Sequence, residues 1–386
     1  MNRNILYFDN AATSWPKPEA TIRAVNSCLR ETSGSPGRSG HSLSIDAGRV
    51  IFNAREAIAV LLGIDDPLRI VLTKNATEAI NITVFGLLKP GDHVITSSME
   101  HNSVMRPLRA MKLSGVELTI LPCSAAGELD LGVIVPAIKK NTKAIFLTHA
   151  SNVTGTIIPV ADVGRIAREH GLVFCVDAAQ TVGALPIDIG ATDIDLLAFT
   201  GHKSLFGPQG TGGLYVRKGL EQFISPLMRG GTGSRSGYEE QPDFMPDKFE
   251  SGTPNTAGYA GLTAGIDFIL SQGLNIISAR EKRLTELFLQ GIGVVDGVTI
   301  YGLKNASRRI AVVSFNIRDM DPAKAALELD ERFGIMSRSG LHCAPSAHRT
   351  IGTFPTGTIR FSFGWFNTEK EINQAVEAIR VLANQK

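Results

Sequence analysis

The 386-residue sequence has few aromatic residues, few cysteines, and no apolar run near the roughly 18 residues that a membrane-spanning helix needs. The residues before Asp9 include only a few apolar side chains and do not match the apolar core of a secretory signal. The formal net charge of +2 gives no electrostatic reason to expect nucleic acid or an anionic membrane as a partner. These absences predict a cytoplasmic protein with neither a nucleic-acid nor a membrane partner.

The cysteines show no paired spacing, and they are Cys28, Cys123, Cys175 and Cys343. In a reducing compartment, scattered cysteines are expected to be free thiols rather than disulfides. His342, Cys343 and His348 do not have the spacing of a usual zinc site, so the sequence predicts no metal.

Strands and helices alternate over the first two thirds of the sequence. Apolar, β-branched strands are predicted at 69–73, 93–98, 116–122, 144–152, 172–180 and 195–203, with helices at 77–88, 103–113, 131–140 and 161–170. This alternation predicts an α/β fold in which helices cover both faces of a parallel sheet.

The pattern changes at about residue 256. Helices predicted at 256–270 and 278–290 precede the strand-like stretches VTIYG, RIAVVSFNI and TIRFSF, which indicates a smaller α+β domain. Because the chain exceeds the size of one small core, we expect a large domain at 17–255 and a small domain at 256–386. The glycine-rich stretch 230–242 is a candidate for mobility.

Polar side chains follow five of the predicted strands. The residues at these strand ends are Asn75, Ala76 and Thr77, then Glu100, His101 and Asn102, then Ser151 and Asn152, then Asp177 and Gln180, and finally Thr200, His202 and Lys203, all polar except Ala76. Ligands of open α/β sheets bind beyond the carboxyl ends of the strands. Each group alone also fits a structural role, such as helix capping for Asn75 or a core position for His101. Five groups at one edge favour a binding site.

Asp177 and Lys203 suggest which ligand this edge would bind. Asp177 follows an apolar strand, so its carboxylate is expected to be partly desolvated and to need a cationic partner. Pyridoxal 5′-phosphate supplies a pyridine nitrogen for Asp177, an aldehyde for a Schiff base with Lys203, and a phosphate for a helix N-terminus. A dinucleotide-binding protein is the alternative, but no GxGxxG motif follows the first strands.

Short motifs along the chain then match a known family. They are YFDNAATSWPKP (7–18), ATEAIN (76–81), EHNS (100–103), HASNVTG (149–155), VDAAQ (176–180), GHK (201–203), FESGTPN (249–255), GLHCAP (340–345) and TIRFSFGWFNT (358–368). With these motifs the chain resembles the class V aminotransferase superfamily of PLP fold type I, and within it the cysteine desulfurase and selenocysteine lyase family. The resemblance implies a mostly parallel seven-stranded sheet, a smaller C-terminal domain that carries the cysteine loop, and a segment, residues 1–16, that closes over the active site.

The resemblance also implies roles for individual residues. Lys203 would form the Schiff base, Asp177 would pair with the pyridine nitrogen, and His101 would stack on the ring. The other implied cofactor ligands are Gln180 and Asn152 beside the ring, Ala76, Thr77, Thr200 and His202 at the phosphate, and Thr253 at the phosphate of a partner subunit. A homodimer with shared active sites is therefore expected. The implied substrate ligands are Arg360, which would bind the carboxylate, with Asn10, Ala11, Asn152 and Arg338.

Cys343 distinguishes the subfamilies, because a desulfurase needs a second nucleophile and an aminotransferase does not. It lies in a glycine-rich, polar loop of the short group II type, where His342 and Arg338 would place positive charge beside a thiolate. The implied reaction converts L-cysteine to alanine and leaves a persulfide on Cys343 for a sulfur-acceptor protein. A selenocysteine lyase, or a class V aminotransferase or β-lyase that does not use Cys343, stays open as an alternative.

Two further expectations concern proton transfer and recognition. His101 is expected to carry a proton to or from the leaving species, because the ordinary pKa of histidine lies near neutrality. Segments 35–44 and 346–357 depart from the family pattern and are candidates for contact with the substrate or an acceptor protein.

Overall fold

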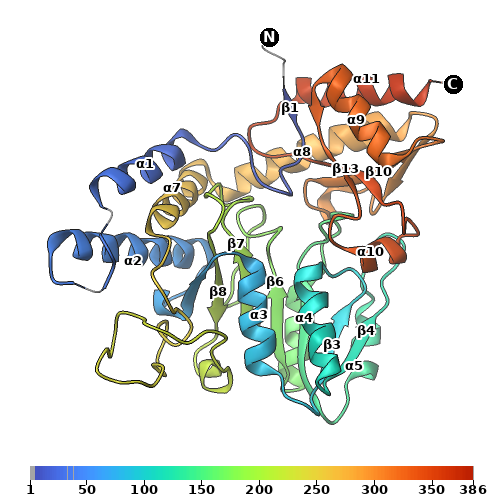
Figure 1. Ribbon diagram of the computed structural model, residues 1–386. Coiled ribbons are helices and arrows are strands. Elements are labelled where there is room, and N and C mark those ends of the chain that lie inside the picture. Colours follow the sequence, from blue (N-terminus) through green and yellow to red (C-terminus); the bar gives the residue numbers. More distant parts are fainter. Residues whose placement is uncertain (1–4, 33, 38, 386) are drawn as a thin grey trace.

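The computed structural model describes residues 5–32, 34–37 and 39–385, so position 38 of segment 35–44 lies outside the described residues. Its largest element is a seven-stranded sheet at the centre of the lower part of the molecule in Figure 1. The strand order is β2 (Ile70–Thr73), β8 (Gly212–Val216), β7 (Leu196–Thr200), β6 (Val173–Asp177), β5 (Thr142–Thr148), β3 (His93–Ser97) and β4 (Glu117–Leu121). Strand β8 runs antiparallel to the other six strands of this sheet, which are parallel to one another. This confirms the predicted mostly parallel sheet.

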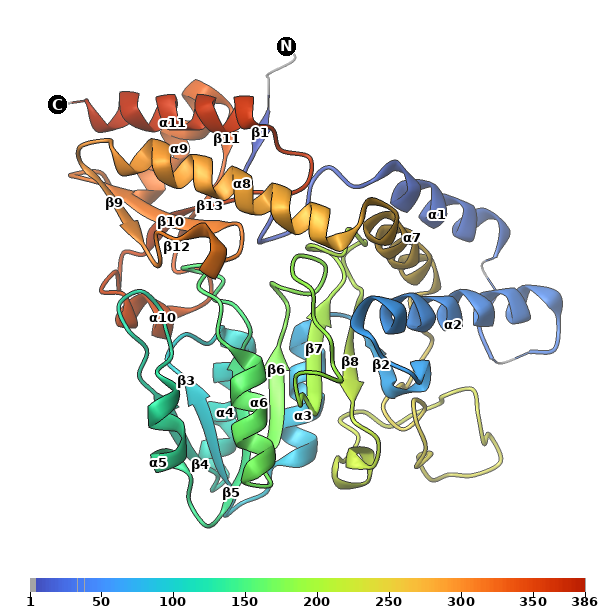
Figure 2. The ribbon, with the colours of Figure 1, turned by 180° about the vertical axis from the view of Figure 1, so that it is seen from behind.

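Helices cover both faces of this sheet, as the sequence predicted. Helices α3 (Ala76–Leu87) and α4 (Asn102–Leu113) lie on the face turned to the viewer in Figure 1, and α6 (Val160–Glu169) lies on the face seen in Figure 2. Alternate residues of β5 supply the two cores, since Phe146 packs with α3 and α4 whereas Ile145 packs with α6. Burial on both faces explains why the strands are continuous apolar runs.

The small domain is built on a four-stranded antiparallel sheet. Its strands are β12 (Arg338–Gly340), β13 (Thr358–Ser362), β10 (Val312–Ile317) and β9 (Val298–Tyr301), packed with α8 (Leu274–Gly293), α9 (Pro322–Phe333) and α11 (Glu369–Ala383). The short strands β1 (Leu6–Tyr7) and β11 (Ile335–Met336) pair in parallel beside it. Helix α10 (Pro345–Thr350) follows the cysteine loop and lies between the two domains in Figure 1.

The remaining helices form a layer at one end of the large sheet. They are α1 (Glu19–Glu31), α2 (Ser42–Leu62) and α7 (Thr256–Gln272), with short 3-10 turns at η1 (Pro67–Arg69), η3 (Leu220–Phe223) and η4 (Ala306–Arg308) elsewhere. The sequence placed residue 256, the first residue of α7, at the start of the small domain. In the structure, Leu262 and Ile266 of α7 pack with the large-domain core. The domain limits drawn from the sequence stay a prediction.

Helices α1 and α2 were not predicted, and two elements between residues 69 and 216 also differ from the sequence prediction. Residues 131–140 form only a 3-10 turn, η2 (Leu131–Val133), and a four-residue helix, α5 (Ile134–Ala137), because Pro136 and four β-branched residues disfavour a longer helix. Strand β8 was not predicted, because it begins with Gly212 and Gly213 and glycine is uncommon in strands. These glycines allow close packing: a Cβ atom at Gly213 would lie 2.3 Å from the Phe199 ring.

No single helix in the described part of the chain is long and apolar enough to cross a membrane. The consecutive helices α7 and α8 meet the length and composition criteria only as a pair, and they are bent by 82° relative to each other.

Candidate active site

The carboxyl edge of the large sheet lies below the small domain in Figure 1, and the turns after its strands carry most of the predicted cofactor ligands. Strand β6 ends at Asp177, which pairs with Thr148 of β5 and Ala198 of β7. The following turns therefore carry Asn152, Asp177 and Lys203 at neighbouring positions along one edge. This is the arrangement that the strand ends predicted.

Lys203 and Asp177 are the two charged groups at the centre of this edge. Burial lowers the pKa of Lys203 to about 8, while the charge of Asp177 opposes that shift. Burial also raises the pKa of Asp177, and three favourable neighbours oppose it: the Ala179 N–H, Lys203 and the Ser103 hydroxyl. The Ala179 N–H donates to Oδ1 at 3.0 Å, and Ser103 Oγ donates to Oδ2 at 3.1 Å. Ser103 had no predicted role, although it lies in the EHNS motif.

His101 caps the N-terminus of α4 and contacts the same network. Its Nδ1 accepts the Ser103 N–H at 3.0 Å. Burial, followed by the charges of Lys203 and nearby arginines, lowers the pKa of His101 to about 3. The ring is therefore neutral at ordinary pH, and its role in proton transfer stays a prediction. A neutral ring still suits stacking on an aromatic cofactor.

Two polar atoms near Lys203 have no hydrogen-bond partner among the described residues. They are Thr200 Oγ1 and His202 Nδ1, and both are buried. Thr200 pairs with Gly212, and a Cβ atom on Gly212 would lie 2.8 Å from the Cα of Asn75, the cap of α3. The unpartnered atoms thus lie near the N-terminus of α3, where Ala76 and Thr77 begin the helix. Such a cradle of donors suits a phosphate group.

Arg360 of β13 approaches the site from the small domain and is only 1% exposed. Its Nη2 donates to Asp9 Oδ1 at 2.8 Å, and its Nη1 donates to the Asn152 carbonyl at 3.1 Å. Its Nε has no partner among the described residues. Asn152 in turn donates from Nδ2 to the His342 carbonyl at 2.7 Å. Asn152 therefore joins Arg360 to the cysteine loop.

The cysteine loop places an exposed thiol beside this network. The Cys343 carbonyl accepts the Asn102 N–H at 2.8 Å, which ties the loop to the start of α4. Arg338 Nη2 lies 3.7 Å from Cys343 Sγ. His342 does not supply the positive charge expected of it, because burial holds its pKa well below the usual value. Of the two predicted cationic neighbours, Arg338 is the one whose guanidinium lies beside the thiol.

The N-terminal segment completes the wall of the site. Gln180 Nε2 donates to the Ala11 carbonyl at 3.2 Å, and Asn10 Nδ2 donates to the Ser362 carbonyl at 3.1 Å. Thr253 lies apart from these residues, exposed at the rim of a groove of about 560 Å³ that Lys74 also lines. The structure therefore does not bring Thr253 to Lys203 within one chain.

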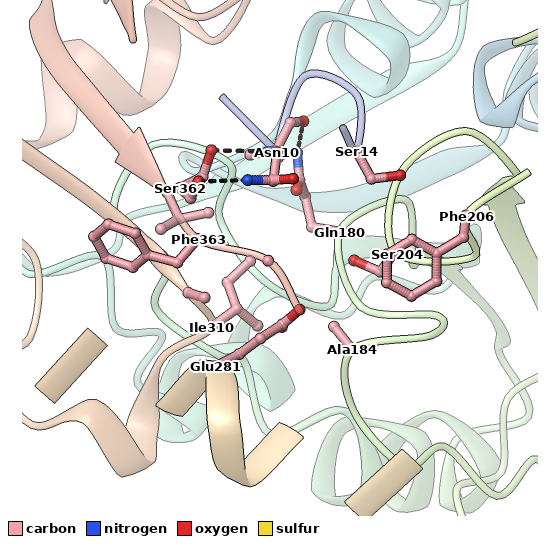
Figure 3. Close-up of a pocket in the computed structure, with 14 residues that line it drawn as sticks. Asn10, Ser14, Gln180, Ala184, Ser204, Phe206, Glu281, Ile310, Ser362 and Phe363 are labelled. Carbon is pink, nitrogen blue, oxygen red and sulfur yellow. Dashed lines mark hydrogen bonds between the residues drawn. The ribbon is translucent and has the colours of Figure 1, made fainter. Parts of the chain in front are cut away.

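Sequence reasoning missed a buried carboxyl next to this wall. Asn10, Gln180, Ser204 and Glu281 line a cavity of about 30 Å³, and Figure 3 shows the carboxyl end of Glu281 directed into it. Glu281 is 8% exposed, its carboxyl has no hydrogen-bond or ion-pair partner among the described residues, and burial raises its pKa to about 8. Nothing in the sequence marked it, because α8 is far from the other lining residues along the chain.

A second buried acid, Glu100, is fully partnered. Ser97 Oγ donates to one carboxyl oxygen at 2.6 Å, and the Thr148 N–H donates to the other at 2.9 Å. Burial raises its pKa to about 8. Glu100 thus ties the turn that carries His101 to β5. No group of three His, Cys, Asp or Glu side chains in the described part of the chain could hold a metal ion.

Comparison with known proteins is consistent with this geometry. The family model for aminotransferase class-V matches residues 6–375. A probable cysteine desulfurase of Methanothermobacter thermautotrophicus is 37% identical, with 99% of this chain and 95% of the relative covered. One from Pyrococcus abyssi is 35% identical, with 96% and 92% covered. This chain belongs to the class V aminotransferase family.

Solved structures show the same relationship. The apo structure of a cysteine desulfurase from Thermococcus onnurineus superposes with a TM-score of 0.92 at 34% identity, covering 98% of this chain and 94% of that one. The cysteine desulfurase CsdA from Escherichia coli gives a TM-score of 0.85 at 30% identity, with 97% and 93% covered. The fold is thus that of PLP fold type I cysteine desulfurases.

Proposed function

We propose that this protein is a PLP-dependent cysteine desulfurase that forms a persulfide on Cys343. The observation that carries the proposal is the pairing of two unlike nucleophiles at one sheet edge. Lys203 is a desolvated amine beside a buried carboxylate, and Cys343 is an exposed thiol on a loop fixed to the same edge by Asn102 and Asn152. An ordinary aminotransferase needs only the first of these groups.

The described residues fit the cofactor. Thr200 and His202 offer unpartnered buried atoms for the phosphate, Asp177 offers a carboxylate for the pyridine nitrogen, and Lys203 offers an amine. When bound, pyridoxal 5′-phosphate supplies an aldehyde for covalent capture of amines and a cationic ring that accepts electrons. A pKa of about 8 leaves a useful fraction of Lys203 neutral near pH 7, as a nucleophilic amine must be. The Ser103 hydroxyl orients Asp177 toward that task.

Arg360 is the proposed ligand for the substrate carboxylate. Its guanidinium is held in place through Asp9 and the Asn152 carbonyl, and its unpartnered Nε is free to donate. The planar fork of arginine suits a carboxylate, which fixes the orientation of the amino acid. Lys203, once displaced, is the proposed base that removes the Cα proton. Asn10 and Ala11 form the wall next to the substrate.

Cys343 is the proposed sulfur acceptor within the enzyme. Its thiolate attacks the sulfur of L-cysteine, a sulfur–sulfur bond forms, and the bond between sulfur and Cβ breaks. The electron pair of that bond stays with the three-carbon fragment, which takes up protons and leaves as alanine. The outer sulfur then passes to an acceptor thiol, and the exposure of Cys343 supports transfer to an acceptor protein.

The decisive experiment uses purified protein, L-cysteine and mass spectrometry. We expect alanine in the absence of any amino acceptor, and a mass gain of one sulfur atom on the peptide that contains Cys343. Alanine that forms only when a 2-oxo acid is supplied would instead indicate an aminotransferase. L-selenocysteine as a parallel substrate tests the lyase alternative, since selenium leaves more readily and a Cys343→Ala variant would then retain activity.

Two further features belong to the same proposal. The exposed position of Thr253 on a wide groove supports a homodimer in which Thr253 reaches the phosphate of the partner subunit. Sedimentation with and without the cofactor tests this dimer. The sequence features described above favour the cytoplasm as the compartment, which fractionation of cells would test.

A further inference from the structure

Residues 9–17, called here the N-terminal strap, connect the small domain to the turn that carries Lys203. At one end, Asp9 pairs with Arg360, and the Ala11 N–H donates to Ser362 Oγ at 2.8 Å. At the other end the strap lies against His202 and Lys203. Ribbon views show the chain passing from β1 in the small domain to α1 beside the large domain (Figures 1 and 2).

The carbonyl of His202 is the main contact of the strap. It accepts from Lys17 Nζ at 2.8 Å, from Thr13 Oγ1 at 3.0 Å and from the Ser14 N–H at 3.0 Å. Ser14 Oγ donates to the next carbonyl, that of Lys203, at 2.8 Å, and itself accepts from Lys17 Nζ at 2.7 Å. Lys17 thus donates hydrogen bonds to the His202 carbonyl and to the Ser14 hydroxyl.

Lys17 has no carboxylate partner among the described residues, although it is half-buried. Burial lowers its pKa to about 8. A desolvated lysine without a counter-charge costs stability and is uncommon in proteins. Its ammonium group donates to two neutral oxygens, the His202 carbonyl of the peptide before Lys203 and the Ser14 hydroxyl, which donates to the carbonyl of the peptide after Lys203. This placement favours a role in the site over a role in general stability.

We propose that Lys17 is a positioning residue for Lys203, which fixes the carbonyl of His202 and thereby the direction in which the Lys203 side chain leaves the backbone. The proposal rests on the proposed function, since it takes Lys203 as the residue that captures the cofactor. The opposite side of the turn is already fixed, because the Gly201 N–H donates to the Thr211 carbonyl at 2.8 Å. Lys17, together with Thr13 and Ser14, therefore holds the side of the turn that faces the strap.

The test compares Lys17→Met, Lys17→Arg and Ser14→Ala with the wild type, and Lys324→Met on the exposed face of α9 serves as the matched control. Each apo-protein is titrated with pyridoxal 5′-phosphate, and the visible absorbance band of the lysine-bound cofactor is followed against pH. We expect Lys17→Met to bind the cofactor about 10-fold more weakly, because a hydrogen bond from a charged group is lost. The pH midpoint of the band should shift, and kcat should fall more than KM rises.

Lys17→Arg should recover most of the cofactor affinity, because a guanidinium also donates to two oxygens. Ser14→Ala should weaken binding in the same direction, and it tests the proposal even when Lys17→Met fails to fold. The proposal would be overturned if Lys17→Met and Ser14→Ala both bound the cofactor with wild-type affinity and showed an unshifted band. This holds even if the thermal midpoint of the apo-protein falls, because a lower midpoint alone would indicate a purely structural role. A wild-type protein that takes up no cofactor would instead refute the proposed function before any variant is compared.

Discussion

The two nucleophiles of the site lie in opposite environments. Lys203 is half-buried and Asp177 is buried, and burial shifts the pKa of each in the direction that disfavours charge. Cys343 is exposed, and it is held by its backbone: His342 and Cys343 have φ angles of 48° and 57°, in the left-handed region. The lysine half of the site is shaped by desolvation, and the cysteine half by backbone conformation.

This difference follows from what each group has to do. A lysine that captures an aldehyde needs a neutral amine at ordinary pH, and removal from water provides one. A thiol that hands sulfur to another protein has to be reached from outside, so burial is not available to it. Two successive left-handed residues instead hold the thiol at a fixed place, at a cost of about 1–2 kcal/mol each. The predictions below test this division.

The largest expected effect is the loss of Lys203. Lys203→Ala should lower the rate of alanine formation by about 10⁴-fold or more, because it removes the amine that is proposed to capture the cofactor and to act as the base. The visible band of the lysine-bound cofactor should be absent in absorbance spectra of the variant. Lys324→Ala, on an exposed helix face, is the control. A retained band in Lys203→Ala would place the cofactor on another lysine.

Loss of the thiol should separate the two halves. Cys343→Ala should keep the visible band and the wild-type cofactor affinity, yet lower sulfide release from L-cysteine by about 10²-fold or more, because one of two nucleophiles is removed. Absorbance and a sulfide assay measure the two effects on one sample. Cys123→Ala removes another thiol as the control. Intact desulfuration in Cys343→Ala would show that Cys343 takes no part.

Much of the lysine half could be predicted from the sequence. Asp177 and Lys203 follow strands, and the ends of parallel strands meet at one edge, so local pattern was enough to bring them together. The α/β fold followed from the same alternation. Strand β8 was missed because glycine is uncommon in strands, and its glycines reflect packing against Phe199 of the preceding strand β7.

Charge states could not be predicted, because they depend on burial. His101 and His342 carry the same side chain as an exposed histidine, but tertiary packing lowers the pKa of each. Lys17 and Glu281 were missed for a related reason. The proposed role of each depends on which groups contact its side chain, and those contacts are set by domain packing rather than by neighbours in the sequence.

Glu281 tests whether desolvation extends beyond Lys203 and Asp177. Its pKa rises from 4.5 to about 8 on folding, so the folded state holds a proton that the unfolded chain releases. The stability that this group contributes is complete below pH 4.5 and is lost as the pH rises toward 8. Glu281→Gln does not titrate, so its advantage in free energy of unfolding should grow with pH, to roughly 1–4 kcal/mol at pH 8.

Urea denaturation at several pH values between 5 and 8 measures this difference. Glu286→Gln, on the exposed side of the same helix, is the matched control and should show no such growth. A constant difference between Glu281→Gln and the wild type across this range would mean that the cavity leaves Glu281 solvated.

The smallest expected effect concerns the backbone of the cysteine half. At a left-handed position glycine carries no Cβ penalty, so Cys343→Gly should be more stable than Cys343→Ala by about 1 kcal/mol in free energy of unfolding. Because the side chain at position 343 is exposed, the Cβ atom of alanine adds little packing that would offset this difference. On α9 the order should reverse, with Lys324→Gly less stable than Lys324→Ala by about 1 kcal/mol. If alanine proved the more stable residue at 343 as well, the loop would relax when the thiol is removed, and backbone conformation would not be what holds Cys343 in place.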